Sequence, residues 1–357
     1  MHRDLYLDPA LFALERERLW ARSWIYAGHD SQLDGGGEVR FDLAGRSAVL
    51  RRGRDGVPRV DAPGTVMVAA HRGFVFARLS PHGLSLADWA GPMLSVLDDL
   101  ADRSPSGRLR VAGAPIRSLV AANWKMYLEN INDTVHPVST HESVSVSARD
   151  VWDAAGGGGE PPPALQQLLP FGSGYAFYEQ MGGRVLPHGH SILGIRASLH
   201  SGHGVPADYH AALVAAHGSA RAEQVLSFAP QNAVLYPSLS VKASPTAIRV
   251  IRPLAVDRTL IEAWAFLPVD APADLARRAQ TYNRLVFSPM SVLAHDDLHV
   301  FASIQAALRA SGNEWVSLHR GHLRGSDESG SADVGGTDER LLRNQFRAWR
   351  EALLQAG

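Results

Sequence analysis

The stretch NWKMYLENINDTVHPVSTH, residues 123–141, holds three potential metal ligands in the order D-x2-H-x4-H. Asp133 and His136 are three residues apart and would share one face of a helix. His136 and His141 are five apart, about 140° around a regular helix, so they cannot reach one ion while that helix continues. Pro137 removes an N–H and disfavours helical backbone at His136, so we expect a break there that lets both imidazoles converge.

Two neutral imidazoles and one carboxylate on one face are the ligand set of non-haem Fe(II) oxygenases, and they leave positions open for dioxygen and substrate. The alternative is that two nearby histidines, in a chain with 16, are ordinary polar or packing residues. A hydrolytic zinc site lacks its HExxH motif here, and a serine hydrolase lacks G-x-S-x-G. Rival ligand pairs are His188 with His190, which would share a strand face, and His200 with His203.

Composition narrows the class of protein. The 357 residues, 45% hydrophobic and 20% charged, are typical of a soluble globular protein of one or two domains. A net charge of −1 argues against a nucleic-acid partner. No apolar run approaches the ~20 residues of a membrane span, and the N-terminus is too charged for a signal peptide, so we expect a cytoplasmic protein without membrane contact. The absence of cysteine excludes disulfides, zinc–thiolate sites and cysteine-ligated iron–sulfur clusters.

The pattern of elements predicts an α+β fold. Glycine and proline interrupt the chain at 34–37, 153–163 and 324–339. Short apolar or alternating runs within 38–80 and 174–270, including GYAFYEQM at 174–181, predict strands of an antiparallel sheet. Helical spacing is found at 5–24, 84–102, 122–137, 205–225, 271–286, 294–311 and in the C-terminal RLLRNQFRAWREALL. No GxGxxG follows a strand, which argues against a dinucleotide-binding fold.

The motif N-W-K-x3-E-N-x2-D-x2-H-x4-H resembles the mononuclear-iron segment of Rieske-type ring-hydroxylating oxygenase large (alpha) subunits. Residues 6–33, 229–266 and 288–308 resemble other parts of that family, so the resemblance covers nearly the whole chain. It implies a helix-grip (START/Bet v 1-like) catalytic domain with an antiparallel sheet and flanking helices over 83–357. It further implies a small β-domain over 38–82, derived from a Rieske domain, and an N-terminal helical segment over 1–37.

The resemblance also implies a site. Its iron ligands are His136, His141 and Asp297, the last being the second Asp of the D-D pair before F-x3-Q. Asp133 takes the role of a carboxylate that links a ligand histidine to a cluster-bound histidine of the neighbouring subunit, as outer-shell carboxylates orient metal ligands in general.

The substrate pocket is less well defined by the sequence. We expect the loop 153–163 to act as a lid. Because only Lys125 and Lys242 are lysine, we expect an arginine to hold any anionic substrate. The side chains expected to line the pocket are Asn130, Tyr175, Phe177, His188 and His190.

One part of the family pattern is missing. Relatives carry C-x-H and, about 15–20 residues later, C-x2-H, which hold a [2Fe–2S] cluster through two cysteines and two histidines. Here DAPGT at 61–65 directly joins the flanking strands, and His71 alone cannot hold a cluster. The chain is therefore expected to have no [2Fe–2S] cluster of its own. The remaining β-domain should be stable only when packed on the catalytic domain.

Three functional hypotheses follow from the resemblance and this gap. In the first, the chain is a non-haem Fe(II) oxygenase component that hydroxylates or oxidatively dealkylates an aromatic or apolar small molecule. Its electrons would come from NAD(P)H through a Rieske-bearing oxygenase subunit or a reductase or ferredoxin, in a trimeric or hexameric homo- or hetero-oligomer. Retention of Asp133 favours this, since without a partner histidine it has no obvious task. The alternatives are a non-catalytic structural or regulatory subunit, and a ligand-binding protein that uses only the cavity.

Overall fold

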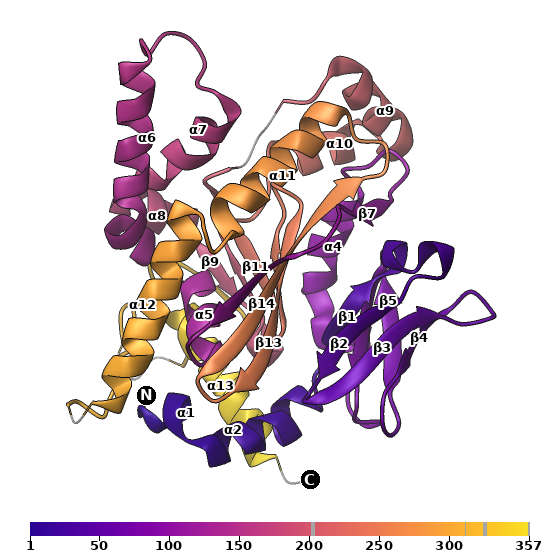
Figure 1. Cartoon of the computed structure of the whole chain (residues 1–357), viewed down its shortest axis with the longest axis vertical. Coiled ribbons are helices and arrows are strands. Elements are labelled where there is room, and N and C mark those ends of the chain that lie inside the picture. Colours follow the sequence, from indigo (N-terminus) through magenta and orange to yellow (C-terminus); the bar gives the residue numbers. More distant parts are fainter. Residues whose placement is uncertain (201–203, 311, 324–326, 356–357) are drawn as a thin grey trace.

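The computed structural model describes residues 1–200, 204–310, 312–323 and 327–355. Within these residues the centre is a nine-stranded antiparallel sheet in the order β15-β9-β10-β11-β12-β13-β14-β7, with β8 also paired to β14 (Figure 1). Its strands are β7 (Leu109–Val111), β8 (Ile116–Val120), β9 (Gly183–Val185), β10 (Ser191–Leu193), β11 (Asn232–Leu235), β12 (Leu239–Lys242), β13 (Ala247–Ala255), β14 (Arg258–Pro268) and β15 (Ala332–Val334). The mixture of this sheet with helices is the α+β architecture expected from the sequence.

The two faces of the sheet have different neighbours because side chains alternate along a strand. On β13, Ile248 and Val250 face one core, which includes Leu97 and Leu100 of α4 (Leu94–Ala101). Arg249 points the other way, towards the face covered by α5 (Trp124–Asn132), α11 (Ala273–Phe287) and α12 (Val292–Arg309). This second face carries the cavity described below.

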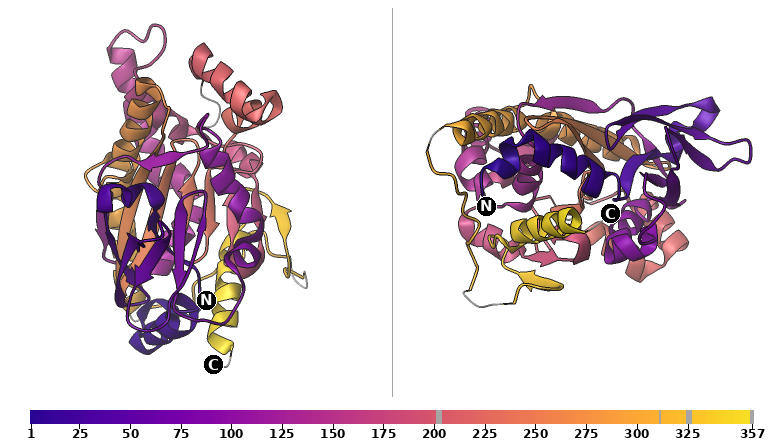
Figure 2. Two further views of the ribbon diagram at one scale, coloured as in Figure 1. Left: turned by 90° about the vertical axis from the view of Figure 1, so that its right-hand side faces the viewer. Right: turned by 90° about the horizontal axis from the view of Figure 1, so that it is seen from below.

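The remaining helices surround this core. They are α3 (Leu86–Ala90), α6 (Glu142–Ala154), α7 (Pro163–Leu168), α8 (Tyr175–Met181), α9 (Ala207–His217), α10 (Ser219–Ser227) and α13 (Arg340–Leu354). The last of these lies beside the N-terminal helices α1 (Asp4–Leu7) and α2 (Pro9–Glu15), so both ends of the chain meet at one end of the molecule (Figure 2). None of the helices in the described residues is long and apolar enough to cross a membrane.

The N-terminal part forms two small sheets. One has the order β1-β6-β5, from β1 (Ile25–His29), β6 (Phe74–Arg78) and β5 (Met67–His71), and the other has the order β2-β3-β4, from β2 (Val39–Leu43), β3 (Arg46–Arg52) and β4 (Pro58–Asp61). The segment 1–37, expected to be helical, therefore also supplies a strand to the β-domain. Between β4 and β5 only residues 62–66 remain.

These sheets share their core with the larger domain. Leu43 and Leu50 are fully buried in the same cluster as Trp124 of α5 and Ile251 of β13. Arg252 of β13 donates a hydrogen bond to the Asp42 carbonyl and lies over the Phe41 ring. The β-domain thus packs on the larger domain, as its small size requires.

One predicted strand was wrong. Residues 175–181 form the helix α8, which ends at Gly182 with a φ of +65°. The apolar pattern of GYAFYEQM fits both periods, but Tyr178 and Met181, three residues apart, are the members that are buried, while Tyr175 is 51% exposed. Residues three apart lie on the same face of a helix, whereas a strand would have buried every second residue.

Candidate metal centre

The helix that precedes the two predicted ligand histidines ends before both of them. The expected break was at His136, and the observed break lies three residues earlier, at Asp133. Helix α5 ends at Asn132, and Asp133 has extended backbone with φ −104° and ψ 141°. Pro137 does not end a helix; it begins a π-helical turn over residues 137–141 that continues into α6. An i→i+5 turn places residues five apart on one side, unlike an α-helix. This is why the rings of His136 and His141 lie with centroids 5.4 Å apart.

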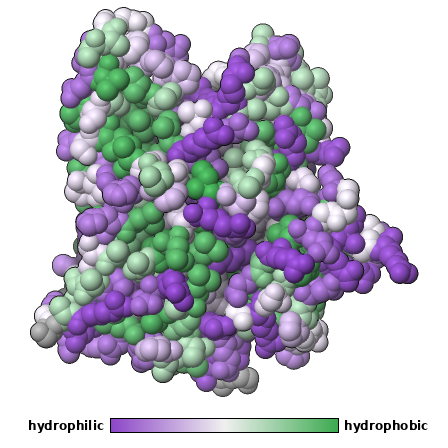
Figure 3. Space-filling view, viewed as in Figure 1, coloured by the Kyte–Doolittle hydropathy of each residue, from purple (hydrophilic) through white to green (hydrophobic). Residues whose placement is uncertain are grey.

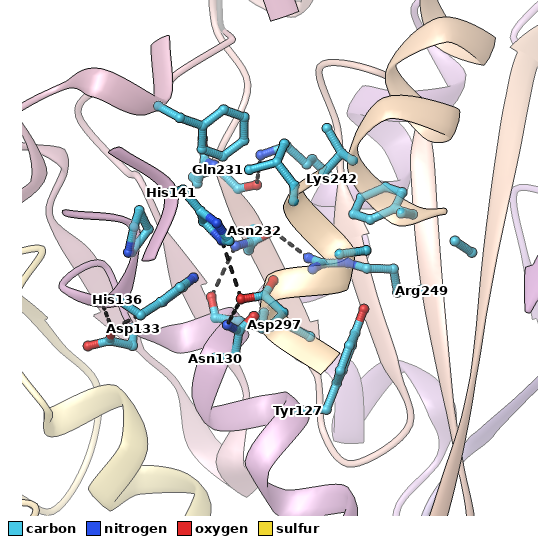
Figure 4. A pocket seen from close by; sticks show the side chains of 18 of the residues that line it. Tyr127, Asn130, Asp133, His136, His141, Gln231, Asn232, Lys242, Arg249 and Asp297 are labelled. Carbon is cyan, nitrogen blue, oxygen red and sulfur yellow. Dashed lines mark hydrogen bonds and ion pairs between the residues drawn. The ribbon is translucent and has the colours of Figure 1, made fainter. Parts of the chain in front are cut away.

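The third predicted ligand comes from a distant helix. Asp297 lies on α12, and its Oδ1 is 3.3 Å from Nε2 of His141. His136, His141 and Asp297 each offer one ligand atom, and these atoms lie within 4.8 Å of one another. Asn130 Nδ2 donates a hydrogen bond to Asp297 Oδ1 at 3.2 Å, which orients that carboxylate (Figure 4). The His141 side chain is only 4% exposed, and its Nδ1 has no hydrogen-bond partner among the described residues.

These atoms fit a divalent transition metal. Two imidazoles and one carboxylate are the facial set that suits non-haem Fe(II), and they leave coordination positions open. The three residues include no thiolate, so they cannot form a structural zinc site that is built from cysteines.

Asp133 is fully engaged inside this chain. Its Oδ2 accepts the His136 backbone N–H at 2.6 Å and lies 3.1 Å from Nδ1 of the same residue, and its Oδ1 accepts from Arg320 at 2.9 Å. Burial alone would raise the pKa of Asp133, but the hydrogen bonds from His136 and the Arg320 charge outweigh burial and lower it. The ionised carboxylate holds Nδ1 of His136 and leaves Nε2 as the atom for a metal. The argument that Asp133 lacks a task without a partner histidine is therefore wrong.

The three ligand residues open into a cavity of about 100 Å³ between the sheet and helices α5, α11 and α12. Its wall is mostly apolar and aromatic, but Asn130, Gln231, Asn232, Lys242 and Arg249 add polar atoms (Figure 4). The apolar and aromatic lining includes Tyr127, Phe171, Tyr178, Met181, Leu193, Ile261, Tyr282, Phe287, Leu293 and Phe301. An apolar pocket with a few convergent polar groups is the usual form of a small-molecule site.

Asn130 is the one residue of the predicted pocket set that lines this cavity. Tyr175 and Phe177 do not, because 175–181 is a helix that turns Tyr178 and Met181 inwards instead. His188 is exposed in a 3-10 turn and not on a strand. The loop 153–163 links α6 to α7 and contributes nothing to the cavity wall, so the structure does not support its role as a lid.

His190 has a structural task. Its Nε2 lies 2.9 Å from the Trp89 carbonyl, and its Nδ1 accepts the Tyr236 backbone N–H at 3.0 Å. Burial lowers the pKa of His190 to about 3, so the ring is neutral and bridges two segments. Of the other rival pair, His200 Nε2 lies 2.9 Å from the Gln167 carbonyl, and His203 lies outside the described residues.

Lys242 and Arg249 line the cavity but were not predicted to do so from the sequence. Arg249 is 6% exposed and Lys242 is 4% exposed, although both belong to apolar strands. A charged side chain within an otherwise buried strand was the available signal, since such a residue is rarely buried without a partner. Which face it points to depends on the register of the sheet, and the sequence alone does not define that register.

The site and the fold together define a class: a helix-covered antiparallel sheet with two histidines and one carboxylate placed so that they could share one metal ion. Residues 108–355 match the sequence model of the ring hydroxylating alpha subunit (catalytic domain), and the chain belongs to this family.

Individual relatives agree with this assignment. The chain is 23% identical to the toluate 1,2-dioxygenase subunit alpha of Pseudomonas putida, over 99% of this chain and 91% of that protein. It is 26% identical to the anthranilate 1,2-dioxygenase large subunit of Acinetobacter baylyi, over 99% and 89%. The solved structure of naphthalene 1,2-dioxygenase from Rhodococcus sp. superposes with a TM-score of 0.75, at 18% identity and over 99% and 94%.

These relatives are oxidoreductases that incorporate oxygen, and the names of the first two denote subunits of dioxygenases. The alignments to the first two extend over 426 and 427 positions, more than the 357 residues of this chain. The relatives therefore carry segments that have no counterpart here, in keeping with the missing cluster loops expected from the sequence.

Proposed function

We propose that His136, His141 and Asp297 bind one Fe(II) and that the chain is the oxygenase component of a multi-chain system. It hydroxylates or oxidatively dealkylates an aromatic or other apolar small molecule with O2. The single observation that carries the proposal is the convergence of three ligand atoms within 4.8 Å at the wall of a largely apolar cavity.

The chain's own residues have defined tasks in this proposal. Bound Fe(II) supplies the activation of dioxygen at its open positions. Asp133 orients His136, and Asn130 orients Asp297, so the ligand geometry exists before the metal arrives. The apolar wall excludes water and holds the substrate beside the metal.

The electrons come from another chain in this proposal. Without cysteine the protein cannot hold a Rieske cluster, so NAD(P)H-derived electrons must arrive through a Rieske-bearing oxygenase subunit, a reductase or a ferredoxin. Apolar side chains gather on the surface over α6 and α7, and Met290 and Val292 are exposed at the start of α12 (Figure 3). Contiguous exposed apolar surface is typical of subunit contacts. It supports assembly with another chain, and a trimer or hexamer is what the family resemblance implies.

Iron content tests the first step. Protein purified anaerobically with Fe(II) should contain close to one iron per chain, and His141→Ala and Asp297→Ala should lose most of it. His210→Ala is the matched control, because His210 pairs with Glu223 on the surface of α9 and α10. A wild-type iron content no higher than that of His141→Ala would overturn the proposal.

Turnover tests the second step. Product should form with NADH, a reductase and a Rieske-bearing homologous subunit, and not when that subunit is omitted. The zero cysteine count also favours a second candidate, a non-catalytic subunit that stabilises an active homologue. That candidate is supported if iron binds but Asp297→Ala leaves turnover of the complex unchanged.

A further inference from the structure

Two cations stand in the wall of the metal-site cavity. Register pairs Ser240 of β12 with Arg249 of β13, and Lys242 with Ala247, so Ser240, Lys242 and Arg249 share one face of the sheet. Figure 4 shows Lys242 and Arg249 on the side of the cavity away from Asp133 and His136. Both cations are therefore placed to meet the end of a bound molecule that lies away from the metal.

Neither cation has a carboxylate partner within 4 Å among the described residues. Arg249 donates to Asn232 Oδ1 at 2.5 Å and to Ser240 Oγ at 2.9 Å, and its Nε has no hydrogen-bond partner there. Lys242 donates through Nζ to the Gln231 carbonyl at 3.2 Å. Burial and the nearby Arg249 charge lower the pKa of Lys242 well below its usual value. An anionic ligand would offset the cost of burying the Arg249 charge and would favour the charged form of Lys242.

The rest of the lining suits an aromatic ring. The Arg249 guanidinium lies 5.1 Å from the Phe287 ring centre, and Tyr127, Tyr282 and Phe301 also face the cavity. The free volume of about 100 Å³ is below the ~150 Å³ of an engineered cavity that takes benzene, so lining side chains must move to admit even a single ring, and larger ring systems would need more movement. Arg249 holds its planar donors against an aromatic face, a geometry suited to a carboxylate.

We propose that Arg249 and Lys242 are specificity-determining residues that hold the carboxylate of a single-ring aromatic acid, with the ring directed towards His136, His141 and Asp297. This inference deepens the proposed function by naming its substrate class. It also changes the expectation that only arginine could hold an anion, because one of the chain's two lysines faces the cavity.

Equilibrium binding to metal-free protein tests this inference without any turnover. By calorimetry, benzoate should bind at least tenfold more tightly than its neutral isostere benzamide. Arg249→Gln and Lys242→Met should each weaken benzoate binding at least tenfold while changing benzamide binding less than threefold. Arg277→Gln is the control, because Arg277 is 71% exposed on α11 and should leave both affinities unchanged.

Each other outcome contradicts the inference. It fails if wild type binds neither probe, if benzoate and benzamide bind equally, or if the variants weaken both to the same extent. Lys242→Met replaces a buried polar group with an apolar side chain of similar length and should fold even if Arg249→Gln does not. Circular dichroism on both variants shows which of them is folded and can be used in the binding comparison. Failure here leaves the iron-content result standing, and a lack of iron leaves carboxylate binding measurable, so the two proposals fail separately.

Discussion

At the scale of single residues, the Asp133 carboxylate interacts with three nitrogen atoms, two of His136 and one of Arg320. It serves the His136 backbone and ring, and also Arg320, which is 187 positions away. In the proposed iron site, Asp133 therefore acts through His136 and is a positioning residue.

Asp133→Asn should weaken Fe(II) binding about 10–100-fold, because the amide lacks the charge that fixes the His136 ring. Competitive titration against a chelator under anaerobic conditions measures this. Arg320→Gln, which keeps the Asp133–His136 contact, should cost less than threefold. Equal affinities for wild type and Asp133→Asn would contradict the assigned role.

Glu129 predicts a pH effect on stability. Its Oε1 accepts from the Tyr6 hydroxyl at 3.0 Å, and burial raises its pKa to about 7, against the opposing effects of that hydrogen bond and of Lys125. The folded state therefore holds the proton more tightly than the unfolded state. Its contribution to stability is full below the unfolded pKa of about 4.5 and is lost as pH rises through 7.

Glu129→Gln removes this linkage. Between pH 5 and 8 the free energy of unfolding of the variant should rise relative to wild type by on the order of 2 kcal/mol. Urea unfolding at several pH values measures the difference. A difference that stays constant with pH would show that the carboxyl keeps its ordinary pKa in the folded protein.

At the scale of elements, one buried ion pair ties three helices together. Lys125 of α5 donates to Glu15 at the end of α2 at 2.5 Å, and both side chains are almost fully buried. The same carboxylate accepts from the indole N–H groups of Trp124 and of Trp349 on α13. Helix α2 thus fixes the position of α5, and α5 ends at Asn132, just before Asp133 and His136 of the candidate site.

Lys125→Met should destabilise the protein by about 3–5 kcal/mol, because it leaves Glu15 charged and buried without its cation. The double variant with Glu15→Gln should recover a large part of that loss. Chemical denaturation of the two single variants and the double variant gives the coupling. If the effects of the two changes simply add, the pair is not a unit.

At the scale of the whole molecule, the β-domain and the catalytic domain share one core. Leu43, Leu50, Trp124 and Ile251 belong to a single buried cluster. The full chain should therefore unfold in one calorimetric transition, and a fragment lacking residues 1–82 should not fold. A separate transition at lower temperature, or a folded fragment with native circular dichroism, would show that the small domain is dispensable.

How much could be predicted from the sequence varies with the kind of feature. Helices with strong spacing, such as α11, α12 and α13, were predicted close to their observed bounds, because an apolar face is a local property. The strand predicted over 175–181 was wrong because a short apolar run fits both the helical and the strand period. The break in the helix was expected at His136 and Pro137, but α5 already ends at Asn132, and Asp133 has extended backbone.

By itself the sequence determined the ligand spacing of Asp133, His136 and His141 and the absence of thiolates, because both depend only on residue order and type. The tertiary structure alone decided what surrounds them. Asp297 and Arg249 lie more than 100 positions from His141, and they reach the cavity through helix packing and strand register. Such convergence results from packing over the entire molecule, and a local pattern does not contain it.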